Sequence, residues 1–192
     1  MRVGGGTANG RRLRTVAGRR VRPTSGRVRQ ALFNMLQGQI TDAVFVDLFA
    51  GTGSVGLEAL SHGAQHVYFI EQDRCALEVL RTNLSRCGLA DQATVIGGTL
   101  PQALKRLPHD LQADVLFLDP PYASDLAEKI LSDLKNFALL STYGVVIWQH
   151  AARHLAPSML LGLSLWQRRR YGDTLLSIYA PRGQESTDRD GA

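Results

Sequence analysis

An acidic residue, two prolines and an aromatic residue follow a buried apolar run, in an order that could do chemistry on an amine. The segment reads Asp114-Val115-Leu116-Phe117-Leu118-Asp119-Pro120-Pro121-Tyr122. Proline has no N–H, so the Pro120 segment offers a carbonyl that can share the two hydrogens of a planar amine with the Asp119 carboxylate. These contacts would position the nitrogen and stabilise the positive charge that grows on it as it attacks an electrophile. Tyr122 would stack on the face of a base, although a rigid strand exit without a ligand is the simpler alternative.

A glycine pattern upstream could hold a cofactor. The apolar run 44–48 predicts a buried strand, and Gly51, Gly53 and Gly56 follow it as G-x-G-x-x-G before a helix. Glycine permits the tight turn and leaves no Cβ between the main chain and a ligand. Glu71 ends the next predicted strand, 20 residues after Gly51, where a carboxylate can accept both hydroxyl protons of a ribose.

The charge beside this glycine turn decides between two cofactor classes. Asp47 stands at the end of the strand, next to the turn. A pyrophosphate would be repelled by a fixed negative charge there, which disfavours a dinucleotide. S-adenosylmethionine carries a cationic amino group and a sulfonium, and a nearby carboxylate stabilises both. A carboxylate immediately before the glycine turn therefore favours the methyl donor over a nicotinamide cofactor or a turn without a ligand.

The elements that must position these residues alternate between short apolar runs and helical patterns, which is typical of βαβ units. We predict strands at 44–48, 66–70, 94–96, 115–119 and 145–149, and helices at 55–62, 74–87, 101–106 and 125–137. Runs at 163–169 and 174–180 predict a closing antiparallel hairpin. The fold class is thus α/β and Rossmann-like, with a mostly parallel seven-stranded sheet whose carboxyl edge binds the ligand.

Basic charge is concentrated at the N-terminus. Nine arginines and no acidic residue between Met1 and Thr41 give +9, and the remaining 13 basic and 17 acidic residues sum to −4. This asymmetry indicates a polyanion partner, with a disordered basic tail as the alternative. Val3, Leu13, Val16 and Val21 alternate with polar residues and could pair as short strands. Thr24 or Ser25 would cap a following helix with Val28, Leu32, Met35 and Leu36 on its apolar face and Arg27 and Arg29 off it.

The 192 residues suffice for one compact domain with an appendage. We expect a basic β-hairpin and helix extension at 1–41, a catalytic domain at 42–182 and a disordered tail at 183–192. No apolar run approaches the roughly 20 residues that span a bilayer, and no secretory signal is recognisable, so we expect a cytoplasmic protein. Cys75 and Cys87 share one helical pattern and are expected to be free thiols rather than a disulfide.

These segments resemble the RsmD-like methyltransferases, which modify the N2 amine of a guanine in bacterial small-subunit (16S) ribosomal RNA. The resemblance covers nearly the whole chain and is carried by Arg2-Val3-Gly4-Gly5, Gly10-Arg11-Arg12-Leu13, Arg22-Pro23-Thr24, Arg27-Val28-Arg29, Leu32-Phe33-Asn34, the glycine loop and Asp119 to Tyr122. It implies a class I methyltransferase fold, S-adenosylmethionine as cofactor, a flipped guanine and an arm that grips the RNA. We expect a monomer that acts on the RNA, free or within an assembling ribosomal particle.

Three sets of site residues are predicted. The catalytic set is Asp119, Pro120, Pro121 and Tyr122. The cofactor set is Asp47, Phe49, Ala50, Gly51, Thr52, Gly53, Glu71, Gln72, Thr99 and Leu100. The RNA-binding set is Arg11, Arg12, Arg14, Arg22, Thr24, Arg27 and Arg29. Three positions depart from the family pattern, since Gln30 and Gln149 stand where glutamate is usual, and Thr99 where an acidic or amide side chain commonly meets the adenine.

Other functions stay open on the sequence alone. The same catalytic set would suit an adenine-N6 methyltransferase acting on DNA or RNA. A nicotinamide-dependent oxidoreductase and a non-catalytic RNA-binding protein are further alternatives, distinguished by which cofactor binds. No metal is expected, because His150 and His154 have no third ligand nearby and are interpreted as a solvated pair. Arg168-Arg169-Arg170 is interpreted as a solvated strand edge that could add a phosphate contact.

Overall fold

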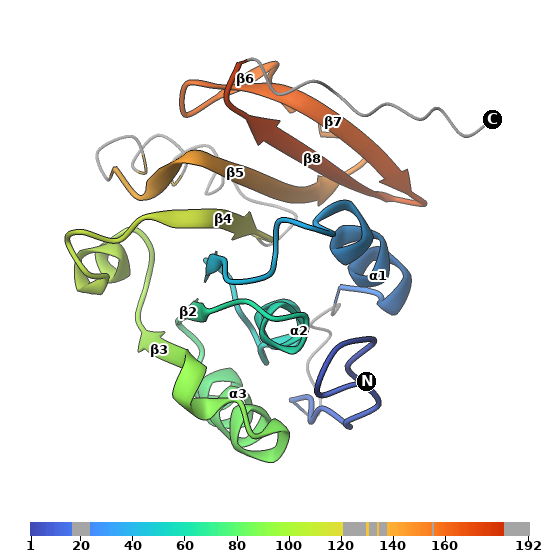
Figure 1. Cartoon of the computed structure of the whole chain (residues 1–192), viewed down its shortest axis with the longest axis vertical. Coiled ribbons are helices and arrows are strands. Elements are labelled where there is room, and N and C mark those ends of the chain that lie inside the picture. The colour runs from blue at the N-terminus through green and yellow to red at the C-terminus, as the bar shows by residue number, and fades with distance from the viewer. Residues whose placement is uncertain (17–23, 121–129, 131–133, 135–137, 155, 183–192) are drawn as a thin grey trace.

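A mixed β-sheet forms the centre of the computed structural model, which describes residues 1–16, 24–120, 130, 134, 138–154 and 156–182. The described residues form one eight-stranded sheet in the order β3-β2-β1-β4-β5-β8-β7-β6 (Figure 1). Its strands are β1 (Val44–Asp47), β2 (His66–Glu71), β3 (Ala93–Gly97), β4 (Ala113–Leu118), β5 (Leu140–Ala151), β6 (Met159–Leu160), β7 (Leu163–Tyr171) and β8 (Thr174–Ala180). The predicted α/β class and C-terminal hairpin are confirmed. The eighth strand, the two-residue β6, is too short for a sequence pattern to show.

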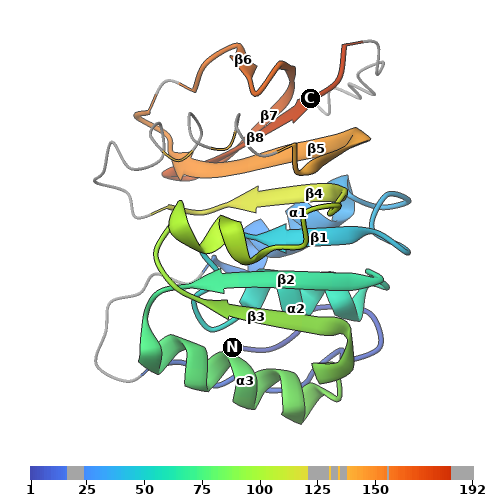
Figure 2. The ribbon, with the colours of Figure 1, turned by 90° about the vertical axis from the view of Figure 1, so that its left-hand side faces the viewer.

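The first five strands pair in parallel, as Figure 2 shows for β5, β4, β1, β2 and β3 in that order. The register places Phe117 of β4 beside both Asp47 of β1 and Ile147 of β5. Side chains alternate between the two faces of a strand. Glu71, Asp47, Asp119 and Gln149 therefore project from the same face at the carboxyl ends of four adjacent strands.

Helices in the described part of the chain are α1 (Gly26–Met35), α2 (Ser54–Ser61) and α3 (Arg74–Cys87), with 3-10 turns η1 (Ala90–Gln92) and η2 (Gln102–Arg106). Ser25 caps α1 by accepting from the Val28 N–H at 3.3 Å, as predicted. The expected helix at 101–106 is a 3-10 turn instead. The expected helix at 125–137 falls largely outside the described residues, within which Ile130 and Leu134 are helical and buried.

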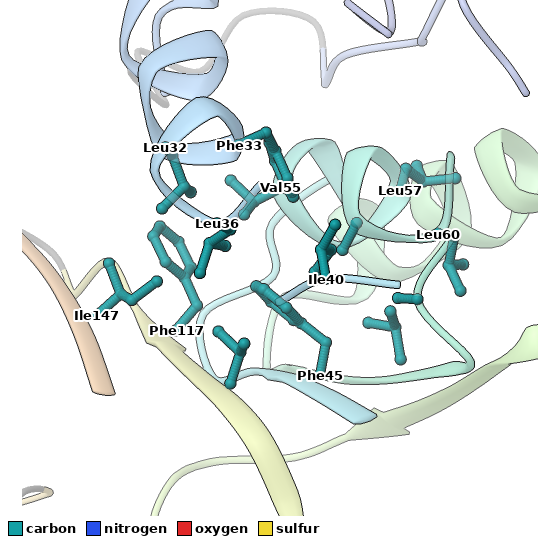
Figure 3. Close-up of a cluster of buried hydrophobic side chains, with 14 of the residues drawn as sticks. Leu32, Phe33, Leu36, Ile40, Phe45, Val55, Leu57, Leu60, Phe117 and Ile147 are labelled. Atoms are coloured by element: carbon teal, nitrogen blue, oxygen red, sulfur yellow. The ribbon is translucent and has the colours of Figure 1, made fainter. Parts of the chain in front are cut away.

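Two buried clusters cover the two faces of the sheet. On one face, α1 contributes Leu32 and Phe33, its C-cap residue is Leu36, and α2 contributes Val55. These side chains pack onto sheet residues such as Phe117 (Figure 3). The same cluster includes Val3 and Leu13 from the N-terminal extension, so that extension shares a core with α1, α2 and the sheet. A second cluster on the other face is built around Leu116, Leu118 and Trp148. Asp47, Asp119 and Gln149 thus emerge on the face that carries α1 and α2.

The N-terminal extension begins as a narrow hairpin. Arg2 and Arg12 form an antiparallel bridge, and the Val3 N–H donates to the Arg11 carbonyl at 3.1 Å. This agrees with the expected pairing around Val3 and Leu13, although the pairing is a single bridge rather than full strands. Val16 lies in no strand. Val21 lies outside the described residues.

Three smaller expectations concern membrane-spanning segments, the two cysteines and the pair His150 and His154. No helix in the described ranges has the length and apolarity needed to cross a membrane. Cys75 and Cys87 are both free and belong to one helix, α3, as expected. The interpretation of His150 and His154 as a solvated pair is wrong for His150, which is buried on β5 and bonded to the Ser177 hydroxyl at 2.8 Å. The described residues contain no cluster of three or more metal-ligating side chains.

Candidate active site

The glycine turn between β1 and α2 has three glycines with different physical roles. Gly53 has φ +85°, and a Cβ added there would lie 2.2 Å from a Leu80 methyl. A Cβ on Gly56 would meet the Phe69 ring at 2.2 Å, so this glycine lets α2 pack closely on β2. Gly51 also has a positive φ, +54°, but a Cβ there would meet nothing within 4 Å. Space for a ligand is therefore present at Gly51, whereas Gly53 and Gly56 serve the packing of the turn.

This difference predicts that the same substitution acts mainly on stability at Gly53 and mainly on cofactor binding at Gly51. Gly53→Ala is expected to destabilise the fold by about 2–4 kcal/mol, because the methyl is strained at positive φ and overpacks against buried Leu80. Gly51→Ala is expected to cost only about 1–2 kcal/mol of backbone strain. Its methyl would stand in the open space, so cofactor affinity should fall. Urea denaturation and calorimetry with S-adenosylhomocysteine measure the two effects, and a Gly51→Ala protein that binds normally would contradict the assignment.

Asp47 is a buried carboxyl group with one unsatisfied oxygen. It is 1% exposed, and its Oδ2 accepts from the Gly56 N–H at 3.3 Å. Its Oδ1 is buried with no hydrogen-bond partner among the described residues. Burial, reinforced by the negative charges of Asp119 and Glu71, raises the pKa of Asp47 to about 7. A buried oxygen of this kind favours a cationic hydrogen-bond donor beside it, which fits the amino group of the predicted cofactor.

Glu71 holds the glycine turn in place. Its Oε2 accepts from the Gly51 N–H at 2.7 Å, and its Oε1 accepts from the N–H groups of Gln72 and Asp73 at 2.8 and 2.7 Å. A carboxylate offers about four lone-pair sites, so three backbone donors leave room for one more. Glu71 therefore fits a single ribose hydroxyl as it stands, and accepting two would require the release of one backbone donor.

Asp119 follows β4 and is held from two sides. Its Oδ2 accepts from the Thr24 hydroxyl at 3.2 Å and from the Gln149 side-chain amide at 2.8 Å. Burial raises the pKa of Asp119 to about 7, and the hydrogen bonds from Thr24 and Gln149 oppose that rise. A carboxyl group with such a pKa both accepts hydrogen bonds and takes up a proton near neutral pH. The next residue, Pro120, is buried, and the predicted Pro121 and Tyr122 lie outside the described residues.

The remaining predicted cofactor residues follow β1, β2 and β3. Phe49, Ala50 and Thr52 form the glycine turn, and Gln72 follows Glu71. Thr99 and Leu100 follow β3, with the Thr99 hydroxyl 3.4 Å from the Gln102 side-chain oxygen. Because β1, β2 and β3 are parallel neighbours, all of these residues lie at the same sheet edge.

The predicted RNA-binding residues separate into exposed and buried groups. Arg11, Arg12, Arg14 and Arg27 are exposed, and Arg22 lies outside the described residues. Thr24 is 5% exposed and donates to Asp119, so it lies beside that carboxyl group rather than on the outer surface.

The prediction that Arg29 lies off the buried face of its helix is wrong. Arg29 is 3% exposed, and its Nε donates to the Glu58 carboxylate of α2 at 2.8 Å. Its Nη2 also donates to the Arg2 carbonyl at 2.7 Å. Arg29 thus ties the extension and α1 to α2, and it is not available to an RNA phosphate.

Two residues with structural links to the site were not predicted as site residues. Asn83 of α3 is fully buried and exchanges hydrogen bonds with the backbone of Arg14 in the extension, and it also donates to the Thr52 carbonyl of the glycine turn at 3.0 Å. Gln149 bonds Asp119. A buried polar side chain in an otherwise apolar pattern is the signal that could have indicated both.

Comparisons with known proteins agree with this arrangement. Residues 1–180 match the family model described as Conserved hypothetical protein 95. The chain is 31% identical over 191 residues to the Ribosomal RNA small subunit methyltransferase D of Escherichia coli (strain K12), covering 99% of this chain and 94% of the relative. It is 39% identical over 134 residues to the protein of the same name from Haemophilus influenzae, covering 69% of each.

Solved structures share the fold. An Escherichia coli structure superposes with a TM-score of 0.82 at 30% identity, covering 97% of this chain and 98% of that chain. An RNA methyltransferase from Salinibacter ruber, in complex with S-adenosyl-L-homocysteine, superposes with a TM-score of 0.61 at 19% identity, covering 88% of this chain and 99% of that one. The latter is a likeness of fold alone.

Proposed function

Since the chain belongs to the family described as Conserved hypothetical protein 95, the RsmD family, we propose that it transfers a methyl group from S-adenosylmethionine to the exocyclic N2 amine of a guanine in small-subunit (16S) ribosomal RNA. Methylation of small-subunit ribosomal RNA is the activity named for its curated relatives. The observation that carries the proposal is the row of Glu71, Asp47 and Asp119 on one face of the carboxyl edge, beside the open space at Gly51.

The cofactor side of this row is formed by β1 and β2. S-adenosylmethionine supplies an electrophilic methyl group on a sulfonium and leaves as S-adenosylhomocysteine. Asp47 would accept from its amino group through the unsatisfied Oδ1, and Glu71 would accept from a ribose hydroxyl. The negative charges of these two carboxylates favour a cationic donor over an anionic dinucleotide.

The substrate side of the row is formed at the end of β4. Asp119 would accept one N–H of the amine while the Pro120 carbonyl accepts the other, which holds the nitrogen in line with the methyl group. As the N–C bond forms, positive charge grows on the nitrogen, and the Asp119 carboxylate stabilises it. The pKa of Asp119, about 7, suits it to take the proton that the nitrogen then loses.

The basic extension would grip the RNA. Arg11, Arg12, Arg14 and Arg27 are exposed and would bind phosphates, which position an RNA without reading its sequence. We propose that the substrate is the ribosomal RNA, free or within an assembling particle, and that the enzyme acts as a monomer. We also propose that 1–41 serves RNA binding and 42–182 catalysis, as two functional parts of one core.

A labelled-methyl assay tests this function. The protein is incubated with radiolabelled S-adenosylmethionine and small-subunit ribosomal RNA transcribed without modifications, either free or in a reconstituted particle. Digestion to nucleosides should then place the label on N2-methylguanosine at one position. Label on N6-methyladenosine, or label on DNA instead of RNA, would overturn the guanine assignment.

A further inference from the structure

We infer that Gln149 and Thr24 are positioning residues for Asp119, which bind one of its carboxyl oxygens and leave the other to the substrate amine. The inference rests on the proposed function and deepens it, because it assigns separate tasks to the two oxygens of Asp119. Both donors reach Oδ2, at 2.8 Å from Gln149 and 3.2 Å from Thr24. Among the described residues, Oδ1 has no hydrogen-bond partner.

The two donors come from different elements, so they fix Asp119 in two directions. Gln149 lies near the end of β5, and β5 pairs directly with β4 up to Leu118 and Trp148. Thr24 lies just before α1, whose cap is Ser25. Two hydrogen bonds, one from a strand and one from a helix entrance, restrict the rotation of the carboxyl group.

The glutamine at this buried position is explained by a functional contact and not by a contribution to stability. Gln149 is 3% exposed, and its Oε1 is buried with no hydrogen-bond partner among the described residues. An unpaired buried amide oxygen is unfavourable, and a leucine of similar size would avoid it. The amide is therefore explained by its Nε2, which donates to Asp119, and replacement by leucine should leave the fold intact.

The surroundings of Asp119 make its two uncharged donors important. The neighbouring acidic groups are Asp47 of β1, whose pKa the charge of Asp119 helps to raise, and Glu71 of β2, which acts on Asp47 in the same direction. The burial of Asp119 favours its protonated form, which accepts fewer hydrogen bonds from an amine. The hydrogen bonds from Gln149 and Thr24 favour the ionised form. On α1, the buried positive charge of Arg29 is already matched by Glu58.

The test is the pH dependence of kcat/KM for methyl transfer to RNA in Gln149→Leu and Thr24→Val. Removing either donor raises the pKa of Asp119, so the acid limb should move to higher pH by about one pH unit, which lowers kcat/KM below the limb by about tenfold. At high pH the loss should be much smaller. Thr24→Ser, which keeps the hydroxyl, should restore the wild-type profile, and Gln167→Leu on β7 serves as a matched control.

The possible results distinguish a failure of this inference from a failure of the proposed function on which it rests. Wild-type protein that methylates no ribosomal RNA refutes the proposed function. The positioning role is refuted if the wild-type protein is active and the variants lose kcat/KM equally at every pH. It is also refuted if the wild-type protein is active and the variants lose no activity. If one variant fails to fold by circular dichroism, the pH profile of the other still decides between these results, because each variant removes one donor from the same oxygen.

Discussion

Asp119→Ala is expected to lower kcat for methyl transfer by at least about 10²-fold, while binding of S-adenosylmethionine stays close to that of the wild type. In the proposed mechanism the carboxylate acts on the amine nitrogen, where positive charge grows only during transfer, so its loss should affect the transition state more than the bound cofactor. The cofactor contacts proposed for Asp47, Glu71 and the glycine turn are untouched. Single-turnover kinetics with labelled cofactor measure the rate, and calorimetry measures the affinity.

Asp110→Ala provides the matched control for this experiment. Asp110 is exposed, ahead of β4, and the same change there should alter neither rate nor affinity. Asp119→Ala protein that methylates RNA within about tenfold of the wild-type rate would contradict the catalytic role. A loss of cofactor binding equal to the loss of rate would instead place Asp119 in the cofactor site.

Arg29→Met is expected to destabilise the protein by about 3–5 kcal/mol, because it leaves the carboxylate of Glu58 buried without its partner. Glu58 is 2% exposed, and within the described residues its other polar contacts are the Gly4 N–H at 2.9 Å and His62 at 3.9 Å. The double variant Arg29→Met with Glu58→Gln should recover most of the loss, since no buried charge remains. Urea denaturation of the single and double variants measures the coupling between the two residues.

Arg27→Met is the control for this prediction. Arg27 lies on the same helix but is exposed, so its replacement should change the free energy of unfolding by no more than about 0.5 kcal/mol. It should weaken RNA binding, which Arg29→Met should do only through unfolding. Equal small effects of both changes would show that Arg29 behaves as a surface residue, as its sequence pattern suggested.

The regular elements could be predicted because their patterns are local. The helix at 74–87 and the strand at 174–180 have the predicted bounds in the structure. In each segment the apolar residues recur at a spacing that one helix or one strand explains. The ends of the helix are also marked, by Asp73 and Gly88. Strand β6 has two residues, too few for any periodicity.

Arg29 was misplaced because its burial depends on a partner that is distant in the sequence. An arginine beside Val28 and Leu32 is expected to face water. It is buried here because Glu58, 29 positions away, neutralises its charge. Nothing within α1 indicates that this glutamate will be close.

The main residues of the candidate site could be predicted from the sequence, but the contacts that hold these residues in place could not. Asp47, Glu71 and Asp119 were placed correctly at the carboxyl edge because each directly follows or ends a recognisable strand. The contacts of Asp119 with Thr24 and Gln149 join positions 95 and 30 residues apart. Such contacts follow from strand order and helix placement, which a single sequence does not specify in enough detail.

The most direct test of the proposed site is a crystal structure of the protein with S-adenosylhomocysteine and a short RNA that presents the target guanine. The proposed function predicts that the guanine N2 lies within hydrogen-bonding distance of Asp119 Oδ1 and faces the sulfur of the cofactor, which rests over Gly51. A complex in which Asp119 points away from that sulfur, or in which the cofactor does not contact the glycine turn, would contradict it.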